Sequence, residues 1–300
     1  MRLGSIRPRD LALFAVMCAI WGLTWIAIRA GVEVLPPFFF AACRFLAAGP
    51  ILLAMAVLAG HRLAVPGHWL RLLWTAMLTN TLCYAAAFWG MRFVPSGFSA
   101  VISEALTPVA VFVVALLARQ ESFSRARFAA VALGVAGLLV MFEGRSSIDP
   151  SPEALAGTLA IVVGTLSFCI GSVFTRPLAQ NFPALVVAGW HCVIGGIGLA
   201  LMSIVMESPT PTLFGAFADP WILASWAFLV LCGSIAAYTI YLRLLDAWGP
   251  TPAIGYSFVS PAIAVAAGVL VFAEQYTSTE GVGALIMLTA TALMVRTVGK

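Results

Sequence analysis

The sequence repeats itself after about half its length, and each copy holds five hydrophobic spans. Each crossing of a membrane reverses the chain, so an odd number of spans leaves the second copy upside down relative to the first. We therefore expect one five-helix repeat over residues 1–145 and an inverted one over residues 153–300. Positions 147 apart pair Trp21, Arg29, Pro36 and Arg44 with Phe168, Arg176, Pro183 and His191. Positions 153 apart pair Phe88, Ala100, Thr107, Pro108 and Glu121 with Tyr241, Ala253, Ser260, Pro261 and Glu274.

The composition places these spans in a lipid bilayer. Hydrophobic residues make up 62% of the 300 positions and charged residues 9%, against ~45–50% and ~25% in soluble domains. Most spans approach the ~20 residues that a helix needs to cross the hydrocarbon core. The sequence predicts an all-α polytopic membrane protein with ten transmembrane helices. The expected spans cover residues 11–30, 38–59, 69–91, 96–118, 126–142, 155–175, 184–206, 221–245, 251–273 and 281–295.

The positive charges predict the orientation, because loops rich in Lys and Arg stay on the cytoplasmic side. With the N-terminus inside, twelve basic residues are cytoplasmic and three lie outside, while Arg44 falls within a span. We expect a multi-pass protein of the cytoplasmic (inner) membrane with both termini cytoplasmic and the first span retained. The inside set is Arg2, Arg7, Arg9, Arg62, Arg71, Arg119, Arg125, Arg127, Arg176, Arg243, Arg296 and Lys300, and the outside set is Arg29, Arg92 and Arg145.

Several function classes find no support in the sequence. The only Lys is Lys300, so no Gly-rich segment can form the lysine-containing loop of an ATPase. All six cysteines lie inside spans without a CxxC pair, which favours packing over metal binding. The net charge of +4 reflects membrane topology, and no nucleic-acid partner is expected. We expect no cofactor, no metal and no enzymatic activity, and a monomer and a homodimer both remain open.

Glu104 lies near the middle of the fourth span. An ionised side chain there costs about 2.5–3.5 kcal/mol on insertion scales, and such residues commonly mark transport pathways. Glu104 could face a hydrated cavity and bind a proton or an ammonium group. The alternative is a static ion pair with Arg44 or Arg92.

Two prolines occupy matching positions in the fourth and ninth spans. Pro108 and Pro261 each leave the carbonyl four residues earlier without its helical donor, and Thr107 and Ser260 place hydroxyls beside them. Both helices should bend at corresponding depths. The exposed backbone either borders a cavity or is satisfied by ordinary helix packing.

Arg44 and His191 are the matching polar residues of the second and seventh spans, about two turns from where each begins. Their symmetry predicts gate positions that approach a cavity from opposite faces of the membrane. Alternatively, Arg44 extends to the interface, and His191 is a structural histidine within the packing.

Five aromatic side chains near span centres are too deep for the interfacial belt. Their rings could line an apolar pocket, with phenol and indole groups adding hydrogen bonds. Each could equally be a core residue. The five are Trp21, Tyr84, Phe168, Tyr238 and Tyr256.

These residues together resemble the EamA family of the drug/metabolite transporter superfamily. The first-half motifs are Trp21-Gly22, Arg29, Pro36-Pro37, Arg44 to Gly49, Val94 to Gly97 and Thr107-Pro108, and the second half offers Phe168, Arg176, Pro183, Pro261 and Glu274. The resemblance implies two EamA-like repeats, with helices one to four and six to nine around a central cavity and helices five and ten peripheral. Relatives export amino acids, related metabolites or drugs. Matched positions are Trp21, Arg44, Pro108, Phe168, His191 and Pro261, whereas Glu104 departs from the family's small or apolar residue.

The leading hypothesis is a secondary transporter that exports small amphipathic metabolites, amino acids or related compounds among them, by alternating access. Its expected partners are a small-molecule substrate, the lipid bilayer and a coupling proton. One alternative is an exchanger of phosphorylated or nucleotide-linked sugars, which would want several cationic residues in the cavity. Another is a membrane enzyme or assembly factor without transport activity.

Overall fold

A computed structural model describes residues 7–94, 96–141, 143, 151–272 and 277–298. Sequence predictions that involve Arg2, Pro95, Arg145, Glu274 and Lys300 lie outside the described residues, as does most of the expected connection between the halves.

The described part of the chain forms helices, without strands. The first half contains α1 (Pro8–Val32), α2 (Pro37–Leu58), α3 (Trp69–Ala76), η1 (Met77–Leu82), α4 (Cys83–Gly90), α5 (Ser96–Leu117) and α6 (Arg125–Met141). The second half contains α7 (Pro152–Asn181), α8 (Ala184–Met206), η2 (Pro211–Ala218), α9 (Pro220–Phe228), η3 (Leu229–Ala237), α10 (Tyr238–Trp248), α11 (Pro250–Ala253), α12 (Tyr256–Phe272) and α13 (Ser278–Val295).

Six helical stretches among the described residues are long and apolar enough to cross a membrane. They are α1, α2, α7, α8, the continuous stretch Pro220–Trp248 and α13. The expected third span, residues 69–91, is helical from Trp69 to Gly90 but carries buried Thr75, Thr79, Asn80 and Thr81. The expected span over 251–273 is divided, because α11 ends at Ala253 and α12 begins at Tyr256.

Local sequence explains where many helices begin. Proline stands in the first turn of α1, α2, α7, α9 and α11, a position that needs no backbone N–H donor. The Ser151 hydroxyl accepts from the Ala154 N–H at 3.2 Å to cap α7. Thr277 and Glu280 form a reciprocal capping box at the start of α13, which satisfies two otherwise unpaired donors.

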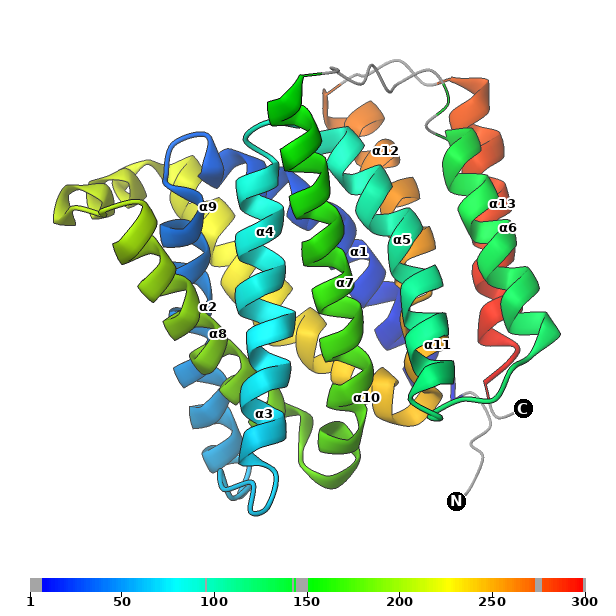
Figure 1. Cartoon of the computed structure of the whole chain (residues 1–300), viewed down its shortest axis with the longest axis horizontal. Helices are drawn as coiled ribbons and strands as arrows, with labels where there is room; N and C mark the ends of the chain where they lie inside the picture. The colour runs from blue at the N-terminus through cyan, green and yellow to red at the C-terminus, as the bar shows by residue number, and fades with distance from the viewer. Residues whose placement is uncertain (1–6, 95, 142, 144–150, 273–276, 299–300) are drawn as a thin grey trace.

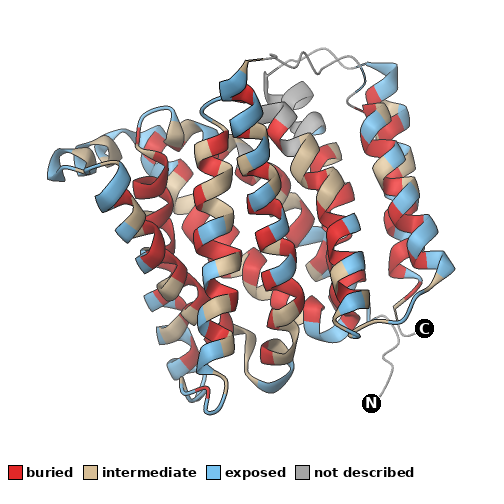
Figure 2. Cartoon of the chain, viewed as in Figure 1, coloured by how far each residue is buried: buried red, intermediate tan, exposed pale blue. Residues whose placement is uncertain are grey.

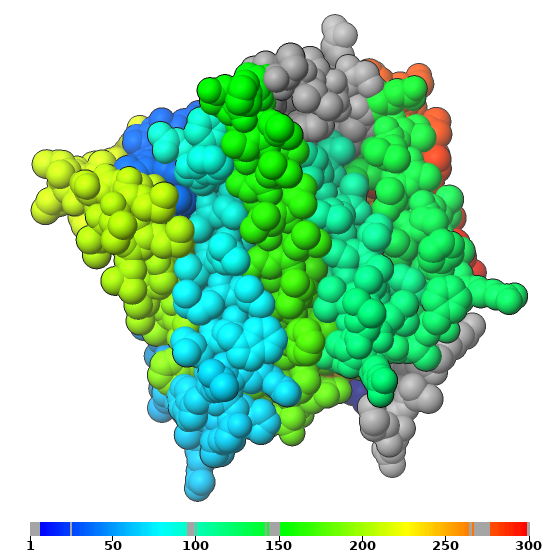
Figure 3. Space-filling view, in the orientation of Figure 1, coloured from blue at the N-terminus to red at the C-terminus, as the bar shows by residue number. Residues whose placement is uncertain are grey.

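The long helices pack side by side in one bundle (Figure 1), with the start of α1 and the end of α13 at the same end of the molecule. We call this the terminal end and the other the opposite end. Helix α2 packs along α8, α6 along α13, and α1 along α12. Helices α3, α4, α7, α5 and α6 form the closely packed face seen in Figure 3. Figure 2 shows buried and exposed residues alternating along the helices, as expected for helices that each turn one side toward the bundle.

Two π-helical segments interrupt the helices that precede α4 and α10. They are η1 and η3, and the offset of 153 places Met77 of η1 opposite Val230 of η3. A π turn inserts an extra residue into a helix and is frequent at functional sites. No local sequence signal predicts either segment, and the hydrophobic pattern predicts continuous α-helix at both places.

Different contacts hold the helices together at the two ends of the bundle: an ion pair at one end and close glycine packing at the other. At the terminal end the Asp10 carboxylate of α1 accepts from Arg243 of α10 at 3.0 and 3.2 Å. At the opposite end α4 and α7 approach through two glycines. A Cβ atom on Gly90 would lie 2.6 Å from the Gly157 carbonyl oxygen, and one on Gly157 would lie 2.9 Å from that of Gly90. Only glycine permits this approach without displacement.

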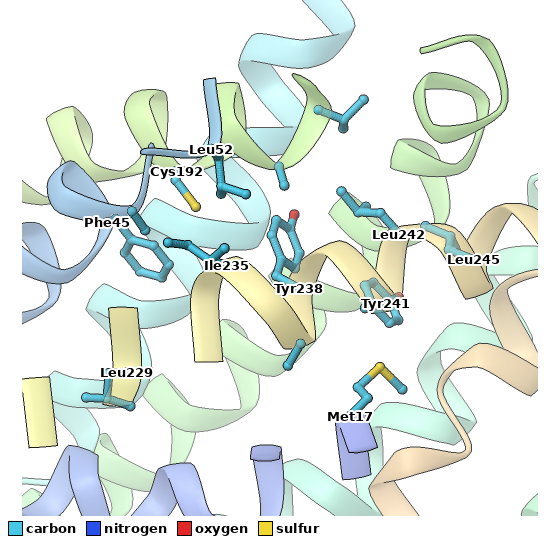
Figure 4. Close-up of a cluster of buried hydrophobic side chains, with 14 of the residues drawn as sticks. Met17, Phe45, Leu52, Cys192, Leu229, Ile235, Tyr238, Tyr241, Leu242 and Leu245 are labelled. Atoms are coloured by element: carbon cyan, nitrogen blue, oxygen red, sulfur yellow. The ribbon is translucent and has the colours of Figure 1, made fainter. Parts of the chain in front are cut away.

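Large buried side chains of α1, α2, α8, η3 and α10 belong to one hydrophobic cluster. Figure 4 shows Tyr238 and Tyr241 on the same helix, with Met17 near Tyr241 and Cys192 and Leu52 on the side of Tyr238. Tyr241 and Met17 are both fully buried. This core fixes the orientation of α10 and thereby the aromatic residues that it presents toward α1.

Candidate functional site

A cavity of about 150 Å³ lies between α1, α2, α4, α5, α7 and α12. We call it the central cavity. It is lined by Trp21, Thr24, Ile28, Arg44, Cys83, Tyr84, Ala87, Phe88, Met91, Ser103, Glu104, Thr107, Thr165, Phe168 and Tyr256. The structure thus brings together seven of the residues singled out by sequence, namely Trp21, Arg44, Tyr84, Glu104, Thr107, Phe168 and Tyr256.

Aromatic rings form one wall of the cavity. The Trp21 ring lies edge-on to Tyr256 with centroids 4.3 Å apart and 5.4 Å from that of Tyr241. The Trp21 indole N–H donates to the Gly233 carbonyl of η3 at 3.3 Å. Phe168 packs behind at 6.2 Å from Tyr241. These contacts hold the rings in place, which gives the wall a fixed apolar shape.

Glu104 is the acidic residue of this lining and is 7% exposed. It projects from α5 one turn before Pro108, and helix α5 continues through that proline. Thr107 lines the same cavity, and the Thr165 hydroxyl donates to Ser103 at 3.1 Å. A carboxylate therefore lies among hydroxyls at the wall of a mostly apolar cavity, where it can bind a cation or a proton.

Arg44 is the basic residue of this lining and is 3% exposed. Its Nε donates to the Ser234 hydroxyl of η3 at 2.8 Å. Its guanidinium lies 4.9 Å from the Phe45 ring centroid and 5.3 Å from that of Tyr84. The side chain therefore remains inside the bundle and does not extend to the membrane interface.

His191 forms a second polar cluster, separate from the central cavity. It is fully buried, and its Nδ1 lies 2.6 Å from the Tyr238 hydroxyl, while Nε2 lies 3.1 Å from that of Thr75. Thr79 is 3.3 Å from Nδ1. Tyr238 thus contacts His191 and is not among the residues lining the cavity.

Arg44 and His191 make reciprocal contacts. Arg44 of α2 reaches Ser234 in η3, and His191 of α8 reaches Thr79 in η1. Each basic residue therefore contacts the π-helical segment of the other half of the chain.

The two prolines and Ser260 lie beside the cavity lining. Ser260 donates to the Cys18 carbonyl at 3.4 Å, and Gly22 of α1 packs against the Ser260 carbonyl oxygen. In the first half, the Cys169 thiol donates to the Thr107 carbonyl at 3.6 Å. Neither Pro108 nor Pro261 is among the residues that line the cavity. Neighbouring helices contact the carbonyls of Thr107 and Ser260, the residues directly before the two prolines.

A wider vestibule of about 790 Å³ lies at the opposite end of the molecule. Its lining includes Arg29, Glu33 and Glu207, and it shares Phe88 and Met91 with the central cavity. The cavity is therefore adjacent to an open space at this end.

Polar contacts connect neighbouring helices at the terminal end of the bundle. Glu121 accepts from the Thr251 N–H at 3.1 Å and from Arg127 at 3.3 Å. Arg176 of α7 donates to the Gln120 carbonyl at 3.0 Å. Tyr241 of α10 also bonds to Ser172 of α7. These contacts join the segment after α5 to α6, α7 and α11, and α7 to α10, at the terminal end of the molecule.

Several residues that line the cavity could not be singled out from the sequence. Thr24, Ser103 and Thr165 are small polar residues, which are common in membrane helices and give no individual signal. Ser234 also gives no individual signal in the sequence, although its hydroxyl accepts a hydrogen bond from Arg44.

The EamA-like transporter family matches residues 10–143 and again residues 155–296. The uncharacterized inner membrane transporter YedA of Escherichia coli is 31% identical over 310 residues, covering 100% of this chain and 94% of that protein. A WAT1-related chloroplastic protein of Arabidopsis thaliana is 27% identical and covers 91% of this chain and 66% of that protein.

A Salmonella typhimurium protein named as a probable amino-acid metabolite efflux pump is 26% identical, covering 93% of this chain and 92% of its own length. A solved crystal structure matches with a TM-score of 0.77 over 96% of each chain. Its sequence identity is 18%, so this likeness concerns the fold alone.

Proposed function

The chain belongs to the EamA-like transporter family, and from this membership we propose that it is a secondary transporter that exports small amphipathic metabolites, amino acids among them. The observation that carries the proposal is a small cavity with an aromatic wall that holds one basic and one acidic side chain, Arg44 and Glu104. Such a site suits a zwitterion with an apolar body, because each charge of the substrate meets an opposite one.

The proposed architecture is ten spans in two inverted five-helix repeats, residues 1–145 and 153–300. Three observations support it. The π-helical segments η1 and η3 occupy matching places. Helices α2 and α8, and α6 and α13, are matching helices that pack against each other. The contact of Gly22 with Ser260 matches that of Cys169 with Thr107 under the same two offsets.

We place the protein in the inner membrane with both termini in the cytoplasm. The excess of basic residues at the terminal end supports this orientation, and the name of the E. coli relative supports the compartment. The vestibule beside Arg29 then opens to the periplasm. Substrate leaves through it after the repeats rock about the central cavity.

Glu104 is proposed to engage the substrate ammonium group or a coupling proton. Amino-acid efflux from proteoliposomes at several pH values, with Glu104→Gln beside wild type, tests this role. We expect a loss of about tenfold or more, as for a charge-assisted hydrogen bond, together with loss of the pH dependence. Glu153→Gln, at an exposed glutamate in the first turn of α7, is the matched control. Mutant flux equal to wild type at every pH would refute the role of Glu104.

The exchange of phosphorylated sugars is the less favoured function. Phosphate recognition commonly uses several cationic donors, and Arg44 is the one basic residue among the described residues that line the cavity. A membrane enzyme is also less favoured, because the family that matches the chain is one of transporters.

A further inference from the structure

We infer that Arg44 binds the carboxylate of the substrate, so that the central cavity selects molecules with one carboxylate at one end. This inference rests on the proposed function, because it concerns the same cavity. It assigns the recognised group and the residue that recognises it.

The guanidinium of Arg44 is held in one orientation on several sides. Its Nε donates to Ser234 at 2.8 Å, and the rings of Phe45 and Tyr84 cover it. Gly233 leaves room for the group, since a Cβ atom there would lie 3.0 Å from Nη2. A guanidinium fixed in this way is preorganised for a planar anion, because little side-chain freedom remains to be lost on binding.

One donor of this group has no partner. Arg44 Nη1 is buried and donates to no hydrogen-bond acceptor within the described part of the chain. Arg44 also makes no ion pair within the described part of the chain. Buried charged donors are normally paired, since an unsatisfied one loses its hydration without compensation. Because Arg44 lines the cavity, a ligand in the cavity can supply the missing charge and acceptor.

A carboxylate fits these constraints better than a larger anion. It is planar and accepts two parallel hydrogen bonds from a guanidinium. The cavity has a volume of about 150 Å³, below the ~300–1,000 Å³ of sites for drug-sized ligands. A phosphate ester would bring more charge than one arginine neutralises. The substrate is therefore a small carboxylate-bearing molecule whose other end lies toward the aromatic wall.

The test compares ligands that differ only in the carboxylate. L-valine, L-leucine and L-phenylalanine, each beside its amide and its decarboxylated amine, are titrated against the purified full chain in detergent, and binding is read as thermal stabilisation. We expect wild type to bind the acids at least about tenfold more tightly than the amides. In Arg44→Gln the difference should fall to within about twofold. Arg125→Gln, which removes an exposed arginine, should retain the full preference.

Two further variants keep the test decisive if Arg44→Gln does not fold. Arg44→Lys retains the charge but lacks the planar fork, and Ser234→Ala frees Nε; both should reduce the preference for the acid without abolishing binding of the amide. Equal binding of acid and amide by wild type, or no binding of any acid, would overturn the inference. So would stabilisation by chloride alone that depends on Arg44 and does not compete with the acids.

The binding test is independent of transport. If proteoliposomes show no flux while the preference for acids depends on Arg44, the proposed transport fails and the assignment of Arg44 stands. If flux occurs with equal affinity for acids and amides, the assignment of Arg44 fails and transport stands.

Discussion

Replacing Glu207 should destabilise the helix that carries Arg44. Helix α2 begins with Pro36 and Pro37, which offer no side-chain cap. The Glu207 carboxylate, at the end of α8, accepts from the backbone N–H groups of Phe38 at 2.8 Å and Phe39 at 2.9 Å. A residue 169 positions away therefore supplies the cap of α2.

The magnitude follows from these two contacts. Hydrogen bonds to a charged group contribute about 1.5–3 kcal/mol each, but Glu207 is only partly buried, so water can satisfy a freed N–H. Measured losses of helix caps are about 0.5–2 kcal/mol. We therefore expect about 2 kcal/mol for Glu207→Ala and about 1 kcal/mol for Glu207→Gln, which keeps one acceptor oxygen.

Thermal unfolding in detergent measures the effect. A loss of about 2 kcal/mol corresponds to a fall in Tm of about 4–8 °C at the scale of large domains. Glu153→Ala, at an exposed glutamate of α7, should change Tm by less than about 2 °C. A Glu207→Ala protein that melts with wild type, or a Glu153→Ala protein that melts as early as Glu207→Ala, would refute the capping role.

Three further predictions concern packing, the ion pair and the cavity. Gly90→Ala should destabilise by about 1–3 kcal/mol through overpacking, whereas Gly215→Ala, which meets nothing within 4 Å, should be neutral; equal melting of both proteins would contradict this. A double-mutant cycle with Asp10→Asn and Arg243→Gln should give a coupling of about 0.5–1 kcal/mol, because Arg243 is 37% exposed, and a coupling near zero at low salt would count against the pair. In a variant that keeps only Cys83, bound amino acid should slow thiol labelling, and an unchanged rate would place the substrate elsewhere.

The charged residues of the cavity could be singled out from sequence because polar side chains are costly inside apolar spans. Arg44 and Glu104 stand out on that ground alone, and the structure places both in one lining. Their neighbours could not be derived, since the choice between core and cavity depends on how helices rotate against each other. Tyr238 and Tyr256 are similar residues in similar spans, yet only Tyr256 lines the cavity.

The helical content was predictable from hydropathy, but the irregular backbone was not. The segments η1 and η3 contain ordinary membrane residues, and the extra residue in their turns is set by packing against other helices. Pro252 and Gly255 are a local sequence signal for the break between α11 and α12. The hydrophobic pattern over residues 251–273 nevertheless predicts one continuous span.

The ion pair between Asp10 and Arg243 makes the two halves of the chain non-interchangeable. Under the repeat offsets, Asp10 corresponds to Gly157 and Arg243 to Gly90. In a protein built from two copies of the first half, Asp10 of one copy would face Gly90 of the other. This aspartate, which is 5% exposed in the present protein, would then have no counter-charge. A protein built from two copies of the second half would do the same to the arginine. The two halves therefore carry complementary charges, and a protein needs both halves to pair Asp10 with Arg243.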